Sequence, residues 1–339
     1  MRFSFSAAAT LLAAAALTGS TDLYASVTIY ATNHMGHHPN LGSDTLIKFN
    51  ADDPANFTTI GSLGVENTGF GGLEFDSEGN LWAYATFNSF GGAASGLYQI
   101  DLKTGAATLQ GTDSGQSLTD LAFNPIDQSM YGVATQGFGT SRLYQVNLET
   151  GSVTVVGVFS GLESFHNLVG AAFDSRGELY VFDNVNSTIF HSNDDFELTA
   201  LYTIPDEVFN GSQGIAIDWS RDDLGYHGAI GQGEFPNYFS QLNTFALDGS
   251  SYVWGESFGP NFSDGLVPVQ AGDLAILPTD REPVGVGDLN GDGVVDVFDL
   301  LLLLDQWGTC PNGTGCPADL NGDGVVDVFD LLVLLDNWE

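Results

Sequence analysis

The sequence predicts a mostly β fold, a five-bladed β-propeller closed by its first and last strands, followed by a small α domain. Three observations support this prediction. A phrase of two apolar strands joined by a tight turn recurs about every fifty residues between 26 and 278. The two ends of that region hold strands that complete one another. A shorter repeat follows, in which residues 288–301 and 319–332 are identical.

The first 25 residues have the pattern of a signal peptide. Arg2 supplies the positive start, an apolar run extends from Ala7 to Leu17, and Ala25 is a small residue before the expected cleavage point. The apolar run is too short to span a bilayer, and no other stretch of the sequence is long enough. We therefore expect a secreted protein without a membrane span.

Each repeat of the propeller region combines an alternating apolar strand, a turn rich in Asp or Asn, and a second strand with an aromatic residue. The copies of this phrase are GLEFDSEGNLWAYA (72–85), DLAFNPIDQSMYGVA (120–134), GAAFDSRGELYVFD (170–183) and GIAIDWSRDDLGYHGAI (214–230). A second hairpin follows the first two copies, at 96–111 and 141–157. Four strands per repeat are typical of one blade of a β-propeller.

The region also predicts that the ring closes. It opens with VTIYATN, DTLIKFN and FTTIGSLG, which fit the second, third and fourth strands of a blade, and GDLAILP at 272–278 fits the missing first strand. Joining both ends in one blade removes exposed sheet edges, which a sandwich of separate hairpins does not explain. Six or seven blades would need repeats that the sequence lacks. The five first strands are marked by Leu73, Leu121, Ala171, Ile215 and Leu274.

The repeated phrase resembles that of NHL/YVTN-like propellers, G-[LI]-A-[FI]-D…G-x-[LI]-[YW], a resemblance that implies an architecture and no particular chemistry. Five-bladed glycosidases of the arabinanase type place carboxylates around the axis. Glu74 on one inner strand, with Asp120 and Asp273 at the start of two others, are the catalytic candidates. We expect binding, with an O-glycosyl hydrolase as the alternative. Acids that recur in the phrase are instead expected in structural Asx turns, namely Asp76, Asp174 and Asp218.

Two further features of the propeller region suggest a ligand. His34, with His37 or His38, could hold a transition metal, although a turn-rich surface loop is the simpler explanation. Several aromatic side chains could form a sugar-stacking surface or belong to the core of the blades. These aromatic residues are Trp82, Phe87, Phe90, Trp219, Phe235 and Tyr238.

The C-terminal repeats carry oxygen ligands at the spacing of a twelve-residue calcium loop. A hard cation that takes six to eight oxygens explains this density of carboxylates, and we expect two calcium ions. A solvated acidic tail is the alternative, and the repetition of the spacing beside apolar helices argues against it. The expected ligands are Asp288, Asn290, Asp292, Val294 (backbone carbonyl), Asp296 and Asp299, then Asp319, Asn321, Asp323, Val325 (backbone carbonyl), Asp327 and Asp330.

Each loop is followed by a Leu-rich helix but preceded by a run of Pro and Gly, so each unit lacks an entering helix. This tandem half EF-hand resembles the type I dockerin module over residues 286–339, although each loop ends in Asp where a full EF-hand has Glu. The resemblance implies docking onto a cohesin module of a scaffold or surface protein, in assemblies that degrade polysaccharides. In that family, loop positions 10 and 11 contact the partner. Here they are Val297, Phe298, Val328 and Phe329, and the alternative is that both Phe pack inside the module.

The chain carries 43 acidic residues against 7 Lys and Arg, a net charge of −36, which disfavours binding to nucleic acid and to anionic membranes. Cys310 and Cys316 lie between the calcium repeats, and export makes a disulfide the expected state. We expect a propeller at 26–278, a linker at 279–286 and a dockerin-like domain at 287–339. The predicted protein is secreted, binds a polysaccharide or a protein through its propeller, and docks onto a cohesin.

Overall fold

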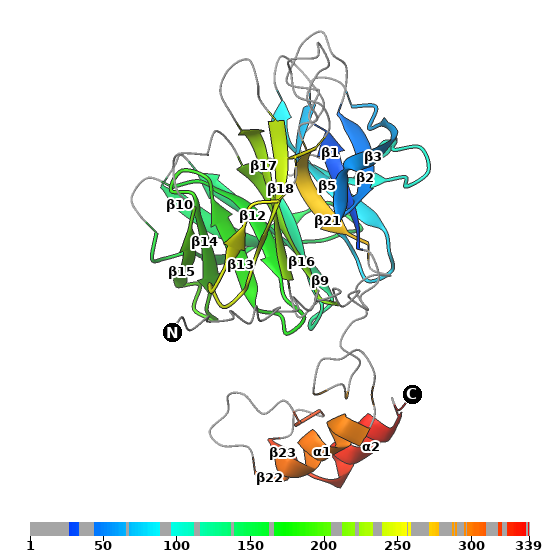
Figure 1. Ribbon diagram of the computed structural model, residues 1–339, viewed down its shortest axis with the longest axis vertical. Coiled ribbons are helices and arrows are strands. Elements are labelled where there is room, and N and C mark those ends of the chain that lie inside the picture. The colour runs from blue at the N-terminus through cyan, green and yellow to red at the C-terminus, as the bar shows by residue number, and fades with distance from the viewer. Residues whose placement is uncertain are drawn as a thin grey trace, which may run out of the picture.

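The structure is a computed structural model (Figure 1). It describes residues 27–33, 44–65, 68–88, 96–111, 116–136, 139–162, 166–204, 212–220, 224–232, 239–255, 257–258, 271–277, 287, 289, 295, 297–309, 318–320, 324–336 and 338. The predicted signal peptide, the histidine loop, the linker and both cysteines lie outside these residues.

The described strands of the N-terminal domain form five antiparallel sheets arranged around a centre (Figure 1). The first sheet contains β21 (Ala271–Ile276), β1 (Thr28–Asn33), β2 (Thr45–Asn50) and β3 (Asp53–Ser62). The second contains β4 (Thr68–Phe75), β5 (Leu81–Asn88), β6 (Gly96–Ile100) and β7 (Ala107–Gln110). The third contains β8 (Asp120–Asn124), β9 (Ser129–Gln136), β10 (Thr140–Val146) and β11 (Val153–Val158).

The last two sheets follow the same order. The fourth contains β12 (Leu168–Phe173), β13 (Leu179–Asp183), β14 (Thr188–Ser192) and β15 (Leu198–Thr203). The fifth contains β16 (Ser212–Asp218), β17 (Leu224–Gln232), β18 (Phe239–Phe245) and β19 (Tyr252–Val253), and β20 (Ser257–Phe258) also pairs with β18. The innermost strands β21, β4, β8, β12 and β16 contact one another in a closed ring. This confirms the five-bladed propeller.

Strand β21 closes the ring by completing the first blade. Ile29 of β1 lies opposite Ile276, and Tyr30 lies opposite Ala275, in an antiparallel ladder. Ile29, Ala275 and Ile276 are all fully buried. The first and last strands of the domain therefore share one sheet, as the sequence predicts.

The acids in the turns of the repeated phrase accept hydrogen bonds from backbone N–H groups of the same turn. Asp76 accepts the N–H groups of Glu78 and Asn80 at 3.0 and 2.9 Å, and it also accepts the indole N–H of Trp82 at 2.8 Å. Asp174 accepts the N–H groups of its own turn in the same way. Asx turns of this kind fix the hairpin between the first two strands of a blade. The recurring acids thus have the structural role expected of them.

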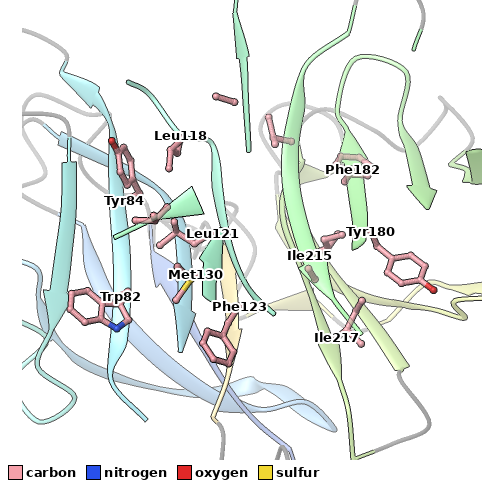
Figure 2. Packing of buried hydrophobic residues seen from close by; sticks show 14 of the residues in the cluster. Trp82, Tyr84, Leu118, Leu121, Phe123, Met130, Tyr180, Phe182, Ile215 and Ile217 are labelled. Atoms are coloured by element: carbon pink, nitrogen blue, oxygen red, sulfur yellow. The ribbon is translucent and has the colours of Figure 1, made fainter. Parts of the chain in front are cut away.

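Apolar side chains of neighbouring blades are buried against one another, and Figure 2 shows one such cluster. Trp82 and Trp219, two of the candidates for a sugar-stacking surface, are 6% and 8% exposed and belong to one core cluster. Both indole nitrogens donate inside the protein, that of Trp219 to the carbonyl oxygen of Phe173 at 2.8 Å. These two side chains are therefore core residues. The side chains of the other four candidates lie outside the described residues.

The C-terminal module is built from two nine-residue helices, α1 (Val297–Asp305) and α2 (Val328–Asp336), drawn in orange and red in Figure 1. Short strands β22 (Gly308–Thr309) and β23 (Val325–Val326) pair antiparallel between them. The buried core is small and consists of Val295, Leu303, Ala318, Val326 and Leu334. Within the described part of the chain, no helix is long and apolar enough to cross a membrane.

Candidate functional site

The second C-terminal repeat has the turn of a calcium loop where the structure describes it. Gly324, the sixth residue of the loop, has a φ of +87°, a left-handed conformation that favours glycine. Its N–H donates to Oδ2 of Asp319, the first residue of the loop, at 2.8 Å. The chain therefore turns sharply at the position where a calcium loop requires a glycine.

Reciprocal caps start the helix that follows this loop. Asp327 precedes α2 and accepts the N–H of Phe329 at 2.8 Å, while Asp330 accepts the N–H of Asp327 at 2.7 Å. This is the pattern of a capping box with Asp in the third helical position. Asp327 at loop position 9 and Asp330 at position 12 are thus held in place by these two hydrogen bonds. Each bond uses one oxygen of a carboxylate.

The acids that close the two loops are buried. Asp299 and Asp330 are 0% exposed, and Asp299 accepts the N–H of Leu289 at 2.8 Å. Burying a carboxylate is unfavourable unless hydrogen bonds or a cation compensate for lost hydration. The sequence from 287 to 339 contains no Lys, Arg or His that could supply the charge. Oxygen donors, a glycine turn and buried acids together fit calcium.

The described residues hold only part of each predicted ligand set. Among them, no group of three or more His, Cys, Asp or Glu side chains lies close enough to hold a metal ion. Asp299, Asp319, Val325, Asp327 and Asp330 are described. The remaining ligands lie outside the described residues, namely Asp288, Asn290, Asp292, Val294, Asp296, Asn321 and Asp323.

The proposed partner contacts are on the surface of the module. Phe298 and Phe329 are both 60% exposed, and Val297 and Val328 are about half exposed. The alternative that the two Phe pack inside the module is therefore wrong. Largely exposed aromatic side chains in equivalent places on two helices are unusual for a surface that faces only water.

Each exposed pair belongs to a larger apolar face that the sequence analysis did not identify. Leu301, Leu304 and Trp307 continue the exposed face of the first repeat, and Leu332, Leu335 and Trp338 continue that of the second. On each helix, by contrast, one Leu is fully buried, Leu303 or Leu334. The sequence feature that could have indicated this face is the apolar run of each helix, because the run is longer than a single buried stripe on a helix requires. We refer to the two sets, with Val297–Phe298 and Val328–Phe329, as docking faces one and two.

The propeller axis gathers the three acids that the sequence analysis named as catalytic candidates. Glu74, Asp120 and Asp273 are 3%, 1% and 0% exposed. Asp120 accepts the N–H of Leu121 at 2.9 Å and, across the blade boundary, that of Ala171 at 2.8 Å. The carboxyl of Asp120 is thus fixed between two inner strands.

Burial, and then the charge of Asp273, raises the pKa of Asp120 well above its usual value, with a further contribution from Glu74. Asp120 and Asp273 occupy the place in the repeated phrase that glycine holds in the other three blades. At two of these glycines, Gly72 and Gly214, a Cβ atom would meet the backbone of the adjacent inner strand. Two carboxyl groups therefore share a narrow space lined by glycine backbone.

Three families of known sequence match parts of the chain. A domain of unknown function, DUF4394, matches residues 6–122, and a repeat of unknown function, DUF6923, matches residues 84–207. The dockerin type I domain matches residues 286–337. No curated protein matches the chain.

Several solved structures are similar to the propeller at low sequence identity. TolB from Acinetobacter baumannii is 14% identical over 74% of this chain and 66% of its own, with a TM-score of 0.41. A structural genomics protein of unknown function from Bacteroides thetaiotaomicron is 14% identical over 68% of this chain and 61% of its own, with a TM-score of 0.44. A protein from Lactobacillus plantarum is 13% identical over 69% and 67%, with a TM-score of 0.36. The chain thus spans about two thirds of the length of these structures, and similarity at this level identifies no activity.

Proposed function

We propose that this chain, which joins a five-bladed propeller to a type I dockerin domain, is secreted and presents its propeller on a cohesin-bearing scaffold or cell surface. There the propeller binds a carbohydrate or a protein and takes part in polysaccharide breakdown. The signal peptide is residues 1–25, the propeller 26–278, the linker 279–286 and the dockerin domain 287–339. The observation that carries this proposal is the pair of exposed docking faces beside two calcium loops.

Type I dockerin domains bind calcium, and in this chain we assign one ion to each loop. The two loops are identical in sequence, so a site that forms in one forms in the other. The module holds an excess of acidic residues and no basic residue after Arg281, and bound cations would offset their repulsion. A disulfide between Cys310 and Cys316 would further restrain the segment between the loops.

The docking faces suit a partner that buries apolar surface. Each face presents one Phe and one Trp, the side chains that most often anchor a protein interface. An apolar face of this extent on a small module would favour association, and calcium fixes its geometry because the loop and the helix share Asp299 or Asp330. Docking should therefore depend on calcium.

Binding to a panel of purified type I cohesin modules, with and without calcium, tests this proposal. Wild-type chain should bind at least one cohesin only when calcium is present. Changing Val297, Phe298, Val328 and Phe329 together to Asp should weaken binding by several kcal/mol, about a thousandfold, because charges would enter an apolar contact.

Two controls separate docking from folding. The fourfold variant should keep its calcium stoichiometry and helix signal, since all four side chains lie outside the module core. Val155→Asp, at an exposed apolar residue of the propeller, should bind cohesin as the wild type does. Equal affinity of the fourfold variant for cohesin would contradict the proposal.

A polysaccharide-cleaving propeller is the second candidate function, and the gathering of Glu74, Asp120 and Asp273 at the axis favours it. A protonated acid beside an ionised one is the arrangement that general acid catalysis uses. The burial of all three acids favours a structural role instead. Incubating the chain with polysaccharides and assaying released oligosaccharides decides between the two. Product release that Glu74→Gln abolishes, without loss of folding, would support the enzyme.

A further inference from the structure

A hollow of about 190 Å³ lies between the third and fourth blades. Its walls include Tyr131 of β9, Phe173 of β12 and Phe196 of the turn between β14 and β15. Polar groups of the same turn, Asn193 and Asp194, share the lining. The hollow therefore combines aromatic faces with hydrogen-bonding groups, which is the composition of a small-molecule site.

The turn that carries Phe196 differs from its counterparts in other blades. At the equivalent place between the third and fourth strands, the second, third and fifth blades have Gly105, Gly151 and Gly249, each with a positive φ of 68–79°. Phe196 adopts the same left-handed conformation, with a φ of 60°. A side chain is rarely found in this conformation because its Cβ is crowded by the backbone. The fourth blade thus holds an aromatic residue where the fold favours glycine.

The interface around Phe196 is shaped to hold its ring. In the other three blades, a Cβ at the turn glycine would clash with a backbone carbonyl oxygen of the preceding blade. In the fourth blade the ring lies against Gly157 of β11, where any Cβ would clash with it. Phe159 packs edge-on against the same ring, with centroids 6.1 Å apart. Unlike the turns of the second, third and fifth blades, this interface gives the turn residue room for a ring, and the hollow lies beside that ring.

The polar lining offers both donors and acceptors. Oδ1 of Asn124 accepts the N–H of Ile126 at 2.8 Å, and Oδ1 of Asn193 accepts the N–H of Glu197 at 2.9 Å, so these bonds leave the amide N–H groups as donors. Asp194 contributes carboxylate oxygens as acceptors, and Glu178 contributes the carboxylate whose Oε2 also bonds to Nε2 of His191 at 2.7 Å. Two carboxylates on a chain of net charge −36 disfavour an anionic ligand.

From this geometry we infer that the hollow between blades three and four binds one ring of an uncharged sugar. Hydroxyl groups both donate and accept, so they match the amides and carboxylates, while the apolar face of the ring stacks on Phe196. The volume is below the ~300–1,000 Å³ of pockets for drug-sized ligands and suits a single ring. This inference rests on the proposed function and narrows its ligand to neutral carbohydrate.

Titration of the full chain, in calcium, with cellohexaose, xylohexaose, mannohexaose and laminarihexaose tests the site. At least one of these neutral sugars should bind, and an oligogalacturonate of the same length should not. Phe196→Gly places at this turn the residue that three other blades have, and it removes a ring that packs against Phe159. The variant should therefore fold with a lower melting temperature than the wild type, and binding is measured well below that temperature. The variant should lose about tenfold or more in affinity, since the stacking surface is gone.

A pair of neighbouring substitutions provides the matched control. Asp194→Asn removes an acceptor from the lining and should weaken binding about fivefold. Asp195→Asn makes the same chemical change one residue further along, outside the lining, and should leave affinity unchanged. Tight sugar binding that survives Phe196→Gly would overturn this site and leave the proposed function standing. Failure of the wild type to bind any of the neutral sugars at millimolar concentration would overturn both this site and the carbohydrate ligand. Cohesin docking is measured separately, so that part of the proposed function would not be affected.

Discussion

The propeller buries most of its large apolar side chains, whereas the dockerin domain exposes many of them. In the propeller, Phe75 and Phe182 are fully buried, and each blade covers the apolar face of the next. In the dockerin domain, Phe298 and Phe329 are 60% exposed. The propeller completes its own core, whereas the dockerin domain leaves a series of large apolar side chains exposed.

Their acids differ in the same manner. Asp76 of the propeller bonds to backbone N–H groups and an indole within its own turn. Asp299 and Asp330 of the dockerin domain are buried in a segment that contains no basic residue. The first arrangement needs nothing from outside the chain, and the second is suited to a metal ion. This comparison predicts that the two domains respond to different changes.

Removing the closing strand should have the largest effect on the stability of the propeller. A chain that ends at Val267 lacks β21, so the buried surface of Ile29 and Ala31 becomes an open edge. The loss should be on the order of 5 kcal/mol in the free energy of unfolding, comparable to the whole stability of a domain. Size-exclusion chromatography should show aggregation for this chain and a monomer for one that ends at Asp280. Equal melting temperatures for the two would contradict closure by β21.

Removing calcium should affect only the dockerin domain. A core of this size supplies no more than about 3–5 kcal/mol, so bound metal must contribute much of its stability. Excess chelator should abolish the helix signal of residues 280–339 in circular dichroism and leave the thermal transition of the propeller in place. Helix content that is equal with and without chelator would show that the loops do not need the ion. A calcium titration of the chain should give two ions.

Relieving the charge repulsion at the axis should have a smaller, stabilising effect on the propeller. The pKa of Asp120 is raised in the folded state, so this group contributes stability that is complete below its unfolded pKa and is lost as pH rises through the folded value. Asp273→Asn keeps an acceptor for the hydroxyl of Thr32 and removes a neighbouring charge. At pH 8 it should raise the melting temperature by about 2–4 °C, on the order of 1 kcal/mol.

The pH dependence distinguishes this effect from a change in packing. The gain from Asp273→Asn should shrink as pH falls below the raised pKa of Asp120, where Asp120 is protonated in the wild type and no longer repels the charge of Asp273. Glu149→Gln, which neutralises an exposed acid, should show no such gain. A gain that is constant from pH 4 to pH 8 would contradict charge repulsion as its cause.

Disabling one docking face should have the smallest effect. Because the loops are identical and the two faces are equivalent, a cohesin can bind in either of two orientations related by half a turn. Changing Val297 and Phe298 to Asp should remove one orientation and cost about RT ln 2, roughly 0.4 kcal/mol, by calorimetry. A strong loss of cohesin binding from this change, with two calcium ions still bound, would show that the faces are not equivalent.

Much of the fold could be predicted from the sequence, because the patterns that indicate it are local or periodic. The strand–turn–strand phrase follows from alternation and Asx turns, and closure follows from the single unpaired strand at 272–278. The resemblance to the dockerin module predicted that Phe298 is exposed, whereas the apolar pattern alone left packing inside the module as an alternative. The approach of Asp120 to Asp273 needed the ring itself, since 153 positions separate them and only closure brings their strands together. The role of Phe196 is likewise visible only beside Gly157 of the neighbouring blade.

The pairing of Ile29 with Ile276 also sets the order in which this protein can be completed. The first blade to leave the ribosome is the last one to be finished, because its innermost strand is made almost 250 residues later. Contacts this distant in the chain form slowly, because the intervening chain must lose conformational entropy before the contacts can stabilise the fold. The ring of a nascent chain of this design therefore stays open until residue 276 of 339 has been synthesised.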